Sequence, residues 1–429
     1  MAEAESTMER LEALREREIN LELDTIENLL DALGNPQDQF ESVHVAGTNG
    51  KGSVCAFLSN MLVSAGQRVG TYASPHVHTV TERIRVDEEN VDEDTFADVA
   101  QRVMDQAEDA GLEPTFFETL TAMALVHFAE ADVDYAVIEV GLGGRKDATN
   151  VLRDPEATVI TNVGIEHAEH LGSSDEQIAR EKAGILRKGV PVVTGADGLA
   201  LKSVWSEAAK RRAPLKVLRS LGSPQIQAND LDGVRFTIPD SPWGELHSSM
   251  PGEHMAENAA LAAHTFQLLR EETDLEAEDA GVPAGIEATD LPGRMDVAQK
   301  EPAFIIDGAH NPDAVKTLRS FLQEREFERY FIMFGALRDK DYGSMMEIMA
   351  PESREVFVTK PPGSGDRGLN AKALAGEAER HCSRVRTVHN IHTALKTMLG
   401  TANPEDAVVV FGSFYLAGRV LDIAPDLVG

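Results

Sequence analysis

The chain has 429 residues, too many for one hydrophobic core, and at about 100–200 residues per domain it predicts two or three domains. With 42% hydrophobic and 26% charged residues, the composition is that of a folded protein and excludes a disordered or fibrous one. The 72 Asp and Glu residues against 40 Lys and Arg give a formal net charge of −32, which repels phosphate backbones and anionic lipid. We therefore expect no nucleic-acid and no membrane partner.

The sequence also indicates the cellular compartment and the character of the protein surface. Two cysteines exclude a disulfide framework or a Cys-rich zinc site, and no stretch has the ~18 apolar residues of a membrane span. The charged first residues lack the apolar core of a signal peptide, so a cytoplasmic protein is expected. Only 13 of the 40 basic residues are Lys, which we interpret as a surface adapted to strong salt; the alternative is an ordinary acidic cytoplasmic protein.

The first 34 residues show a charged helical pattern with a thin apolar stripe, and a repeating pattern follows. Short β-branched runs alternate with helical stretches, which predicts βαβ units and a parallel sheet. Several of the runs are almost entirely apolar, as strands covered on both faces must be. The runs occupy 42–46, 68–73, 134–140, 157–163 and 190–195.

The pattern changes between 216 and 250, where alternating runs separated by Pro-Asp-Ser-Pro predict a small antiparallel patch, and a helix follows over 258–270. The Gly- and Pro-marked stretch 284–294 indicates a domain boundary, with the linker at 289–295. The βα pattern then restarts at 303–307, 329–335, 355–360 and 407–412. We predict an N-terminal α/β domain over 1–288 and a second, Rossmann-like α/β domain over 296–429.

The segment Gly47-Thr48-Asn49-Gly50-Lys51-Gly52-Ser53 lies between a predicted strand and a predicted helix. Glycines let backbone N–H groups turn toward a polyphosphate, the helix N-terminus adds positive potential, and a lysine neutralises charge. The usual signature differs, because Val45 and Gly52 stand where a glycine and a Ser or Thr are expected. Nucleotide binding is favoured over a purely structural turn, so we predict that the domain over 1–288 is a P-loop ATP-binding domain with a parallel sheet.

Three polar residues end predicted parallel strands, where open α/β sheets bind their ligands. Ser74 follows the second strand, Glu139 interrupts the apolar run before Gly141, and His167 follows the fourth strand. A carboxylate in a buried strand is costly unless it is paired or bound to a metal, so Glu139 is a candidate Mg²⁺ ligand. The alternatives are a turn-capping role for Ser74 and a loop position for His167.

Lys182 falls at helical spacing with Ile178, Ile185 and Leu186, within the apolar stripe of a helix that Ser174 caps. The alternative to a buried functional lysine is a long side chain that extends to the surface. Two residues near the linker are further candidates: Asp307 ends a strand where an acid can bind ribose, and Arg294 could reach a phosphate. For both, an ordinary turn residue is the alternative.

Together these segments resemble the folylpolyglutamate synthase/dihydrofolate synthase family, within the Mur-ligase superfamily of ATP-dependent amide ligases. The motifs are spread in order from residue 45 to past 340, which makes the set specific. They are VAGTNGKGS (45–53), ASPH (73–76), ERIRV (82–86), FFETLTAMA (116–124), EVGLGGRKDATN (139–150), TNVGIEH (161–167), EKAGIL (181–186), LPGRMDV (291–297), DGAHNP (307–312) and FGALRDKD (334–341).

The resemblance implies roles for single residues. ATP would be bound by the phosphate loop, Thr48 to Ser53, and by Asn258, Arg294 and Asp307. Ser74 and Glu139 would hold one Mg²⁺, and Glu139, His167 and a carbamylated Lys182 a second. Thr115 and Asp147 would lie at the pterin-bearing part of the substrate. His310 would also lie at the substrates. Catalysis would depend on Lys51, Glu139, His167 and Lys182.

The implied reaction is ATP-dependent ligation of L-glutamate to dihydropteroate or a (tetrahydro)folate through an acyl phosphate, and we expect both activities in one monomeric protein. The C-terminal domain would be the glutamate ligase domain. The alternatives are another Mur-type amino-acid ligase or a P-loop ATPase switch. The switch would need neither a second α/β domain nor glutamate.

Overall fold

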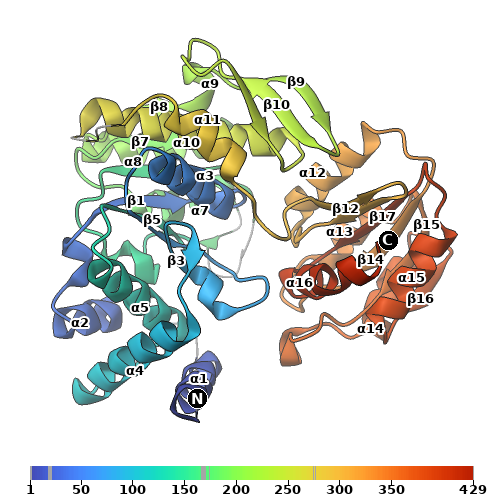
Figure 1. Cartoon of the computed structure of the whole chain (residues 1–429), viewed down its shortest axis with the longest axis horizontal. Helices are drawn as coiled ribbons and strands as arrows, with labels where there is room; N and C mark the ends of the chain where they lie inside the picture. The colour runs from blue at the N-terminus through green and yellow to red at the C-terminus, as the bar shows by residue number, and fades with distance from the viewer. Residues whose placement is uncertain are drawn as a thin grey trace.

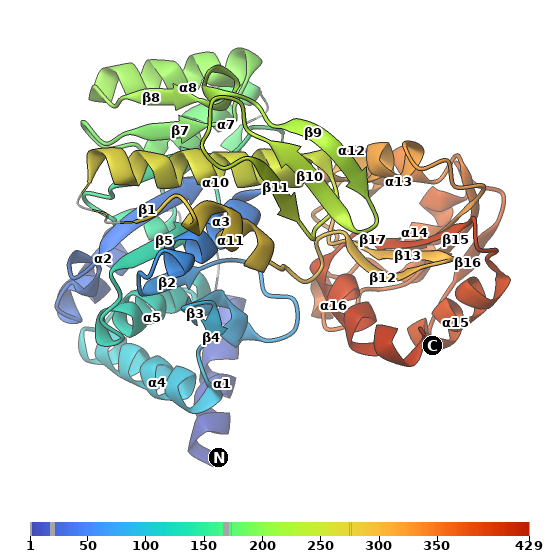
Figure 2. The same cartoon turned by 45° about the horizontal axis from the view of Figure 1, so that its top comes forward.

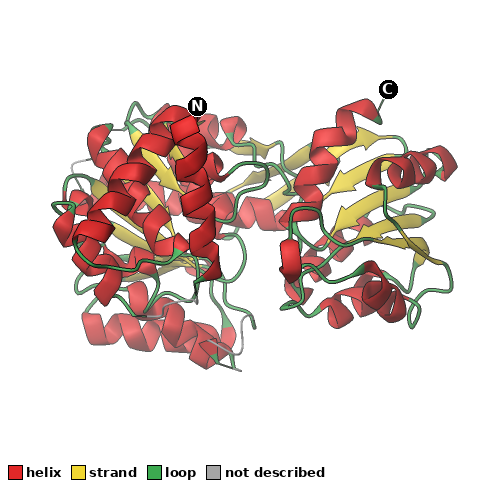
Figure 3. Cartoon of the chain, turned by 90° about the horizontal axis from the view of Figure 1, so that it is seen from below, coloured by secondary structure: helices red, strands yellow, loops and turns green. Residues whose placement is uncertain are grey.

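The computed structural model describes residues 2–17, 22–165, 171–172, 174–273, 275 and 277–428. Within them the chain forms two α/β domains that lie side by side (Figure 1). Seen from below, each consists of strands with helices on both sides (Figure 3). The predicted α/β fold class, with parallel sheets in both domains, is confirmed.

The first domain is built on an eight-stranded sheet in the order β4-β3-β2-β5-β1-β6-β7-β8. The strands from β2 to β8 in that order pair in parallel, while β3 and β4 form an antiparallel edge. The bounds are β1 Glu41–Ala46, β2 Val69–Tyr72, β3 Ile84–Val86, β4 Glu89–Asn90, β5 Tyr135–Glu139, β6 Ala157–Ile160, β7 Val192–Thr194 and β8 Leu215–Val217.

The central strands are buried on both faces, which explains their nearly continuous apolar sequences. Because side chains alternate along a strand, Val137 packs into the core under α3 and α10, whereas Ala136 and Ile138 pack under α4 and α5 on the other face. The helices are α1 Ala2–Ala13, α2 Asp24–Ala32, α3 Lys51–Ser64, α4 Glu93–Asp109, α5 Phe116–Glu130, α7 Asp175–Lys182, α8 Gly198–Arg211, α9 Leu218–Leu221, α10 Glu253–Glu272 and α11 Gly281–Ala288.

A separate three-stranded antiparallel sheet covers α10, as the alternating pattern near residue 240 predicts. Its strands are β9 Gln225–Asp230, β10 Gly233–Thr237 and β11 Glu245–Ser248, in the order β11-β10-β9. The β9–β10 hairpin extends from the first domain toward the second (Figure 2). The sequence pattern did not indicate β9, because its residues are mostly polar.

The second domain has a six-stranded sheet in the order β12-β13-β17-β14-β15-β16, parallel except for the edge strand β12. Helices α12, α13 and α14 cover one face, and α15 and α16 cover the other. The bounds are β12 Asp296–Lys300, β13 Ala303–Ile306, β14 Tyr330–Phe334, β15 Ser353–Val358, β16 Val385–Thr387, β17 Ala407–Phe411, α12 Pro312–Gln323, α13 Tyr342–Met349, α14 Ala371–Ala378, α15 Ile391–Thr401 and α16 Phe414–Ile423.

The region around the domain junction differs in part from the sequence pattern. Helix α11 extends to Ala288, so the Gly- and Pro-marked stretch that begins at residue 284 is helical in its first part. The domain limits 1–288, 289–295 and 296–429 stay a prediction. Among the described helices, none is both long and apolar enough to cross a membrane.

Close backbone packing between α11 and α3 gives a first testable prediction. A Cβ at Gly285 would lie 2.4 Å from the backbone nitrogen of Met61, whereas a Cβ at Gly376, inside α14, meets nothing within 4 Å. Ala normally stabilises a helix interior by about 0.5–1 kcal/mol over Gly. We therefore expect Gly376→Ala to be neutral or stabilising and Gly285→Ala to destabilise by about 1–3 kcal/mol, because rigid backbone must move.

Denaturant unfolding of the two variants measures this difference in the free energy of unfolding. Equal midpoints for Gly285→Ala and Gly376→Ala would show that the α11–α3 contact is not close-packed.

Candidate active site

The phosphate loop connects β1 to α3, as the sequence predicts, and backbone and side-chain contacts hold it against the end of β6. The Thr161 hydroxyl donates to the Asn49 carbonyl at 2.7 Å, and the Asn49 N–H donates to the Asn162 side chain at 2.9 Å. The Thr48 hydroxyl both donates to the Gly164 carbonyl and accepts from its N–H, each at 3.0 Å. The loop conformation is therefore fixed by residues more than a hundred positions away.

Two loop glycines are required by their surroundings. Gly47 has φ +152°, and a Cβ there would lie 1.8 Å from the hydroxyl oxygen of Thr161. Gly50 has φ +83°, and its Cβ would lie 2.3 Å from the side-chain oxygen of Asn258 on α10. The loop thus approaches both β6 and α10 more closely than any side chain permits.

Two lysines donate to the same backbone carbonyl. The ammonium nitrogen of Lys51 lies 3.1 Å from the Gly47 oxygen and 3.0 Å from the Thr48 oxygen. Lys182, at the end of α7, donates to the Gly47 oxygen at 2.6 Å. Its side chain is only 1% exposed, so it does not extend to the surface as the alternative interpretation required.

Glu139 ends β5 and is 3% exposed. One of its carboxylate oxygens accepts the Ser74 N–H at 2.7 Å. Burial raises the pKa of the Glu139 carboxyl, and the charges of Lys51 and Arg294 oppose that rise. A Cβ at Gly52 would be 3.5 Å from the same carboxylate, which is ordinary van der Waals contact, so the carboxylate lies close to the loop.

The linker and the second domain supply the opposite side of the site. Burial lowers the pKa of the Arg294 guanidinium, and the negative charges of Asp307, in the second domain, and Glu139, in the first, counteract this. Burial raises the pKa of Asp307 to about 6 against the attraction of Arg294. Asp307 accepts the N–H groups of Ala309, at 2.6 Å, and Met295, at 2.9 Å, which fixes the turn after β13 to the linker.

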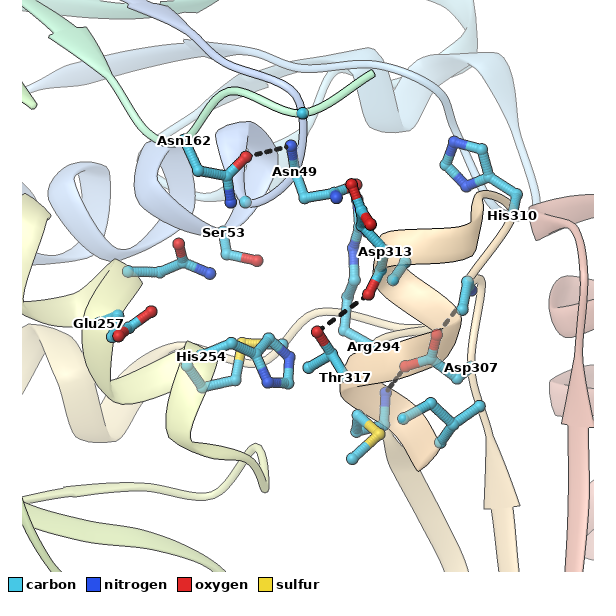
Figure 4. Close-up of a pocket in the computed structure, with 18 of the residues that line it drawn as sticks. Asn49, Ser53, Asn162, His254, Glu257, Arg294, Asp307, His310, Asp313 and Thr317 are labelled. Atoms are coloured by element: carbon cyan, nitrogen blue, oxygen red, sulfur yellow. Dashed lines mark hydrogen bonds between the residues drawn. The ribbon is translucent and has the colours of Figure 1, made fainter. Parts of the chain in front are cut away.

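One side-chain hydrogen bond joins the two loops across the domain boundary: the Asn311 amide donates to the Asn49 side chain at 2.9 Å. Between them lies a cavity of about 240 Å³ whose walls come from both domains (Figure 4). The predicted site residues that line it are Asn49, Gly50, Ser53, Asn258, Arg294, Asp307 and His310. The structure therefore brings together residues up to 261 positions apart, as the ATP assignment requires.

Other lining residues were not singled out in the sequence. They include the His254 imidazole, whose pKa burial lowers to about 4 and whose Nδ1 has no hydrogen-bond partner among the described residues. His254 is four positions before Asn258, the spacing that places two side chains on one helix face, so the signal was present. The further residues are Asn162, Glu257, Asp313 and Thr317, of which Asn162 and Asp313 lie in or next to recognised motifs.

Two predicted substrate residues lie outside this cavity. Thr115 caps α5, where its hydroxyl accepts the Glu118 N–H at 3.3 Å. Asp147 is buried and accepts the Thr149 hydroxyl at 2.6 Å and the Leu142 N–H at 2.7 Å. Burial raises the pKa of the Asp147 carboxyl, and these hydrogen bonds oppose the rise.

His167 lies outside the described residues. In the part of the chain that is described, there is no group of three or more His, Cys, Asp and Glu side chains that could hold a metal. Glu139 and the adjacent Ser74 nevertheless fit Mg²⁺, which in phosphate-transfer sites uses one or two carboxylates together with water and substrate phosphates. A buried carboxylate with a raised pKa is also the kind of group that a cation stabilises.

Comparison with known proteins agrees with this geometry. Residues 45–266 match the Mur ligase middle domain, and residues 293–414 match the Mur ligase glutamate ligase domain. Fold and site together thus define a Mur-type ligase, a class of ATP-dependent enzymes that form carbon–nitrogen bonds.

Individual relatives show which Mur-type ligases the chain is similar to. Folylpolyglutamate synthase of Lacticaseibacillus casei is 33% identical over 91% of this chain and 92% of its own length. A probable bifunctional folylpolyglutamate synthase/dihydropteroate synthase of Haloferax volcanii is 34% identical over 95% of this chain, which spans about half (49%) of that relative's length. The structure of Mycobacterium tuberculosis folylpolyglutamate synthase complexed with ADP superposes with a TM-score of 0.89 at 30% identity, covering 99% of this chain and 98% of that one.

The chain belongs to the folylpolyglutamate synthase/dihydrofolate synthase family of Mur ligases. The predicted resemblance is confirmed.

The contact between Gly50 and Asn258 gives a prediction with a matched control. Gly34 has almost the same backbone angle, φ +82° against +83°, but a Cβ there meets nothing within 4 Å. An Ala at either position would have to adopt a left-handed backbone conformation, which lowers the stability by roughly 1–2 kcal/mol. Only Gly50→Ala also displaces Asn258, and we expect it to weaken ADP binding about tenfold or more.

Isothermal titration calorimetry with ADP and Mg²⁺, combined with unfolding midpoints, separates the two effects. If Gly50→Ala and Gly34→Ala bound ADP equally well, Asn258 and the loop would not form one nucleotide site.

Proposed function

We propose that the chain ligates L-glutamate to the carboxylate of dihydropteroate or a folate, at the expense of ATP. The observation that carries the proposal is the cavity between the domains, where the phosphate loop of one domain and the DGAHNP loop of the other are joined by the Asn311–Asn49 hydrogen bond. A ligase needs a nucleotide between two domains so that their closure excludes water from a reactive intermediate. The names of the relatives support the choice of glutamate and folate.

The reaction has two steps. A substrate carboxylate oxygen attacks the γ-phosphorus of ATP, ADP leaves, and an acyl phosphate forms. The amine of glutamate then attacks the acyl carbon, the bond from that carbon to the bridging oxygen breaks, phosphate leaves with its electron pair, and the amine loses a proton. Such phosphoryl transfer needs positioning and charge neutralisation more than covalent help from the protein.

The residues of the phosphate loop, Thr48 to Ser53, would bind the ATP phosphates, and Lys51 would neutralise their charge. In the structure its ammonium group is held by two loop carbonyls, next to the buried carboxylate of Glu139. Asn258 and Asp307 would bind the rest of ATP from the two walls. Arg294, which interacts with acids of both domains, would contact phosphate as the domains close.

Ser74 and Glu139 would hold one Mg²⁺, and Glu139, His167 and a carbamylated Lys182 would hold a second, as the resemblance implies. When bound, the ions neutralise phosphate charge. Thr115 and Asp147 would lie at the pterin-bearing part of the substrate, and His310, on the DGAHNP loop of the second domain, at the substrates. We expect the protein to act as a monomer in the cytoplasm.

Product analysis tests the proposal. Mass spectrometry should detect one added glutamate when dihydropteroate, ATP, Mg²⁺ and glutamate are supplied, and chain extension when tetrahydrofolate replaces dihydropteroate. Another Mur-type ligase would show neither product. A P-loop switch would release phosphate at the same rate without glutamate.

Lys51→Ala should reduce product formation roughly a hundredfold or more, because a single ammonium offsets phosphate charge in the transition state. Lys188→Ala is the matched control, since that lysine is exposed and outside the cavity. A folded Lys51→Ala protein with near-normal turnover would contradict the phosphate-loop assignment.

We propose further that Lys182 works as a carbamate. Its side chain is 1% exposed and its nitrogen lies against the Gly47 carbonyl, and burial disfavours an ammonium. A neutral amine adds to carbon dioxide with loss of one proton, which makes a carboxylate on a long arm and an oxygen ligand for Mg²⁺. Lys182→Ala should then be nearly inactive and partly rescued by acetate, and Lys182→Arg should stay inactive.

Steady-state ligation rates with and without added acetate measure this. An active Lys182→Arg protein would end the carbamate proposal and favour an ammonium that contacts the acyl phosphate. A Lys182→Ala protein whose ligation rate does not rise with added acetate would also contradict the carbamate proposal.

A further inference from the structure

Two helices from different domains form facing walls of the nucleotide cavity (Figure 4). The first turns of α10 contribute His254, Glu257 and Asn258, and α12 contributes Asp313 and Thr317. The distance between these helices therefore sets the width of the cavity. The linker alone does not set that distance, because it joins the domains at one point.

The β9–β10 hairpin makes a second connection between the domains, beside α12 (Figure 2). Leu231, at its tip, packs against the core of the second domain. The neighbouring Asp232 forms an ion pair with Lys300 on β12. The hairpin thus belongs to the first domain by its strands and to the second by the contacts of its tip.

Asn229 on β9 contacts the residue before α10 and the residues that follow the end of α12. Its side-chain oxygen accepts the N–H of Gly252 at 2.9 Å, and its side-chain nitrogen donates to the Glu324 carboxylate at 3.3 Å. Its backbone carbonyl accepts from the Arg325 guanidinium at 2.5 Å. Gly252 is the residue before α10, and Glu324 and Arg325 directly follow α12.

Both helix ends depend on these contacts. Helix α10 begins at a glycine with φ +110° and has no side-chain cap of its own, so Asn229 supplies the hydrogen bond that locates its start. Arg325 also donates to the Phe321 carbonyl and lies over the Phe321 ring at 3.2 Å, which ties its guanidinium to α12. An asparagine suits this place because its amide accepts on one side and donates on the other.

We propose that Asn229 is a positioning residue that sets the separation of α10 and α12, and thereby the fit of the cavity to the nucleotide. The proposal rests on the proposed function only in taking the ligand to be an adenine nucleotide. Asn229 and Glu324 do not line the cavity, so any effect of their replacement on nucleotide binding must pass through the two helices.

The test is ADP binding by isothermal titration calorimetry on the full chain, with unfolding midpoints for every variant. We expect Asn229→Ala and Glu324→Ala each to weaken ADP binding, Asn229→Ala about tenfold. Glu324→Gln, which keeps an oxygen acceptor, should bind nearly as the unchanged protein does. Gln227→Ala is the matched control: Gln227 is an exposed residue of the same strand, and its side chain donates to Thr237 within the small sheet, its one side-chain hydrogen bond among the described residues.

The double variant Asn229→Ala/Glu324→Ala should bind ADP no more weakly than Asn229→Ala alone, because both changes break one connection. Unchanged ADP affinity in folded Glu324→Ala and Asn229→Ala would overturn the proposal. A double variant whose ADP affinity falls by the product of the two single effects would overturn it as well. Because ADP binding is measured without ligation, these outcomes are independent of whether glutamate is joined to a folate. A protein that binds ADP but forms no glutamylated product would refute the proposed function and leave the role of Asn229 standing.

Discussion

Two lysine side chains, Lys51 and Lys182, donate to one backbone carbonyl, that of Gly47, and much of the site depends on this arrangement. It places two cationic side chains or their modified forms against a glycine-rich loop in a protein of net charge −32. Such a local departure from the overall charge is what a polyphosphate-binding loop requires. The buried carboxylate of Glu139 is near enough for the charge of Lys51 to oppose the rise of its pKa.

The loop can hold this form only because distant residues support it. Thr161 and Asn162 follow β6 and bond to Asn49, and Asn258 on α10 lies where a side chain at Gly50 would be. Parallel strands end at the same edge of a sheet, so β1, β5 and β6 deliver these groups to one place. The second domain contributes the loop that carries Asn311, so the site is built from residues of both domains.

The sequence predicted the central strands, the parallel arrangement and the phosphate loop, because each leaves a local signal in burial pattern or glycine spacing. It did not indicate β9, β12 or β16, which are edge strands with polar residues, since one exposed side weakens the apolar pattern. His254 was missed as a cavity residue and Asn311 as the partner of Asn49, although helical spacing and a recognised motif pointed to them. The interpretation of the acidic surface as an adaptation to salt stays a prediction.

By itself the sequence determined the family and the α/β class, and it pointed to seven of the residues that line the cavity, because these follow from short motifs in fixed order. Only the tertiary structure decided that Lys182 is buried against Gly47, that the charges of acids from both domains act on Arg294, and that Asn229 joins α10 to α12. The physical reason is the range of the interactions. Turn chemistry and strand burial act between neighbours in the chain, whereas cavity width and the position of a charge depend on contacts between segments about a hundred residues apart.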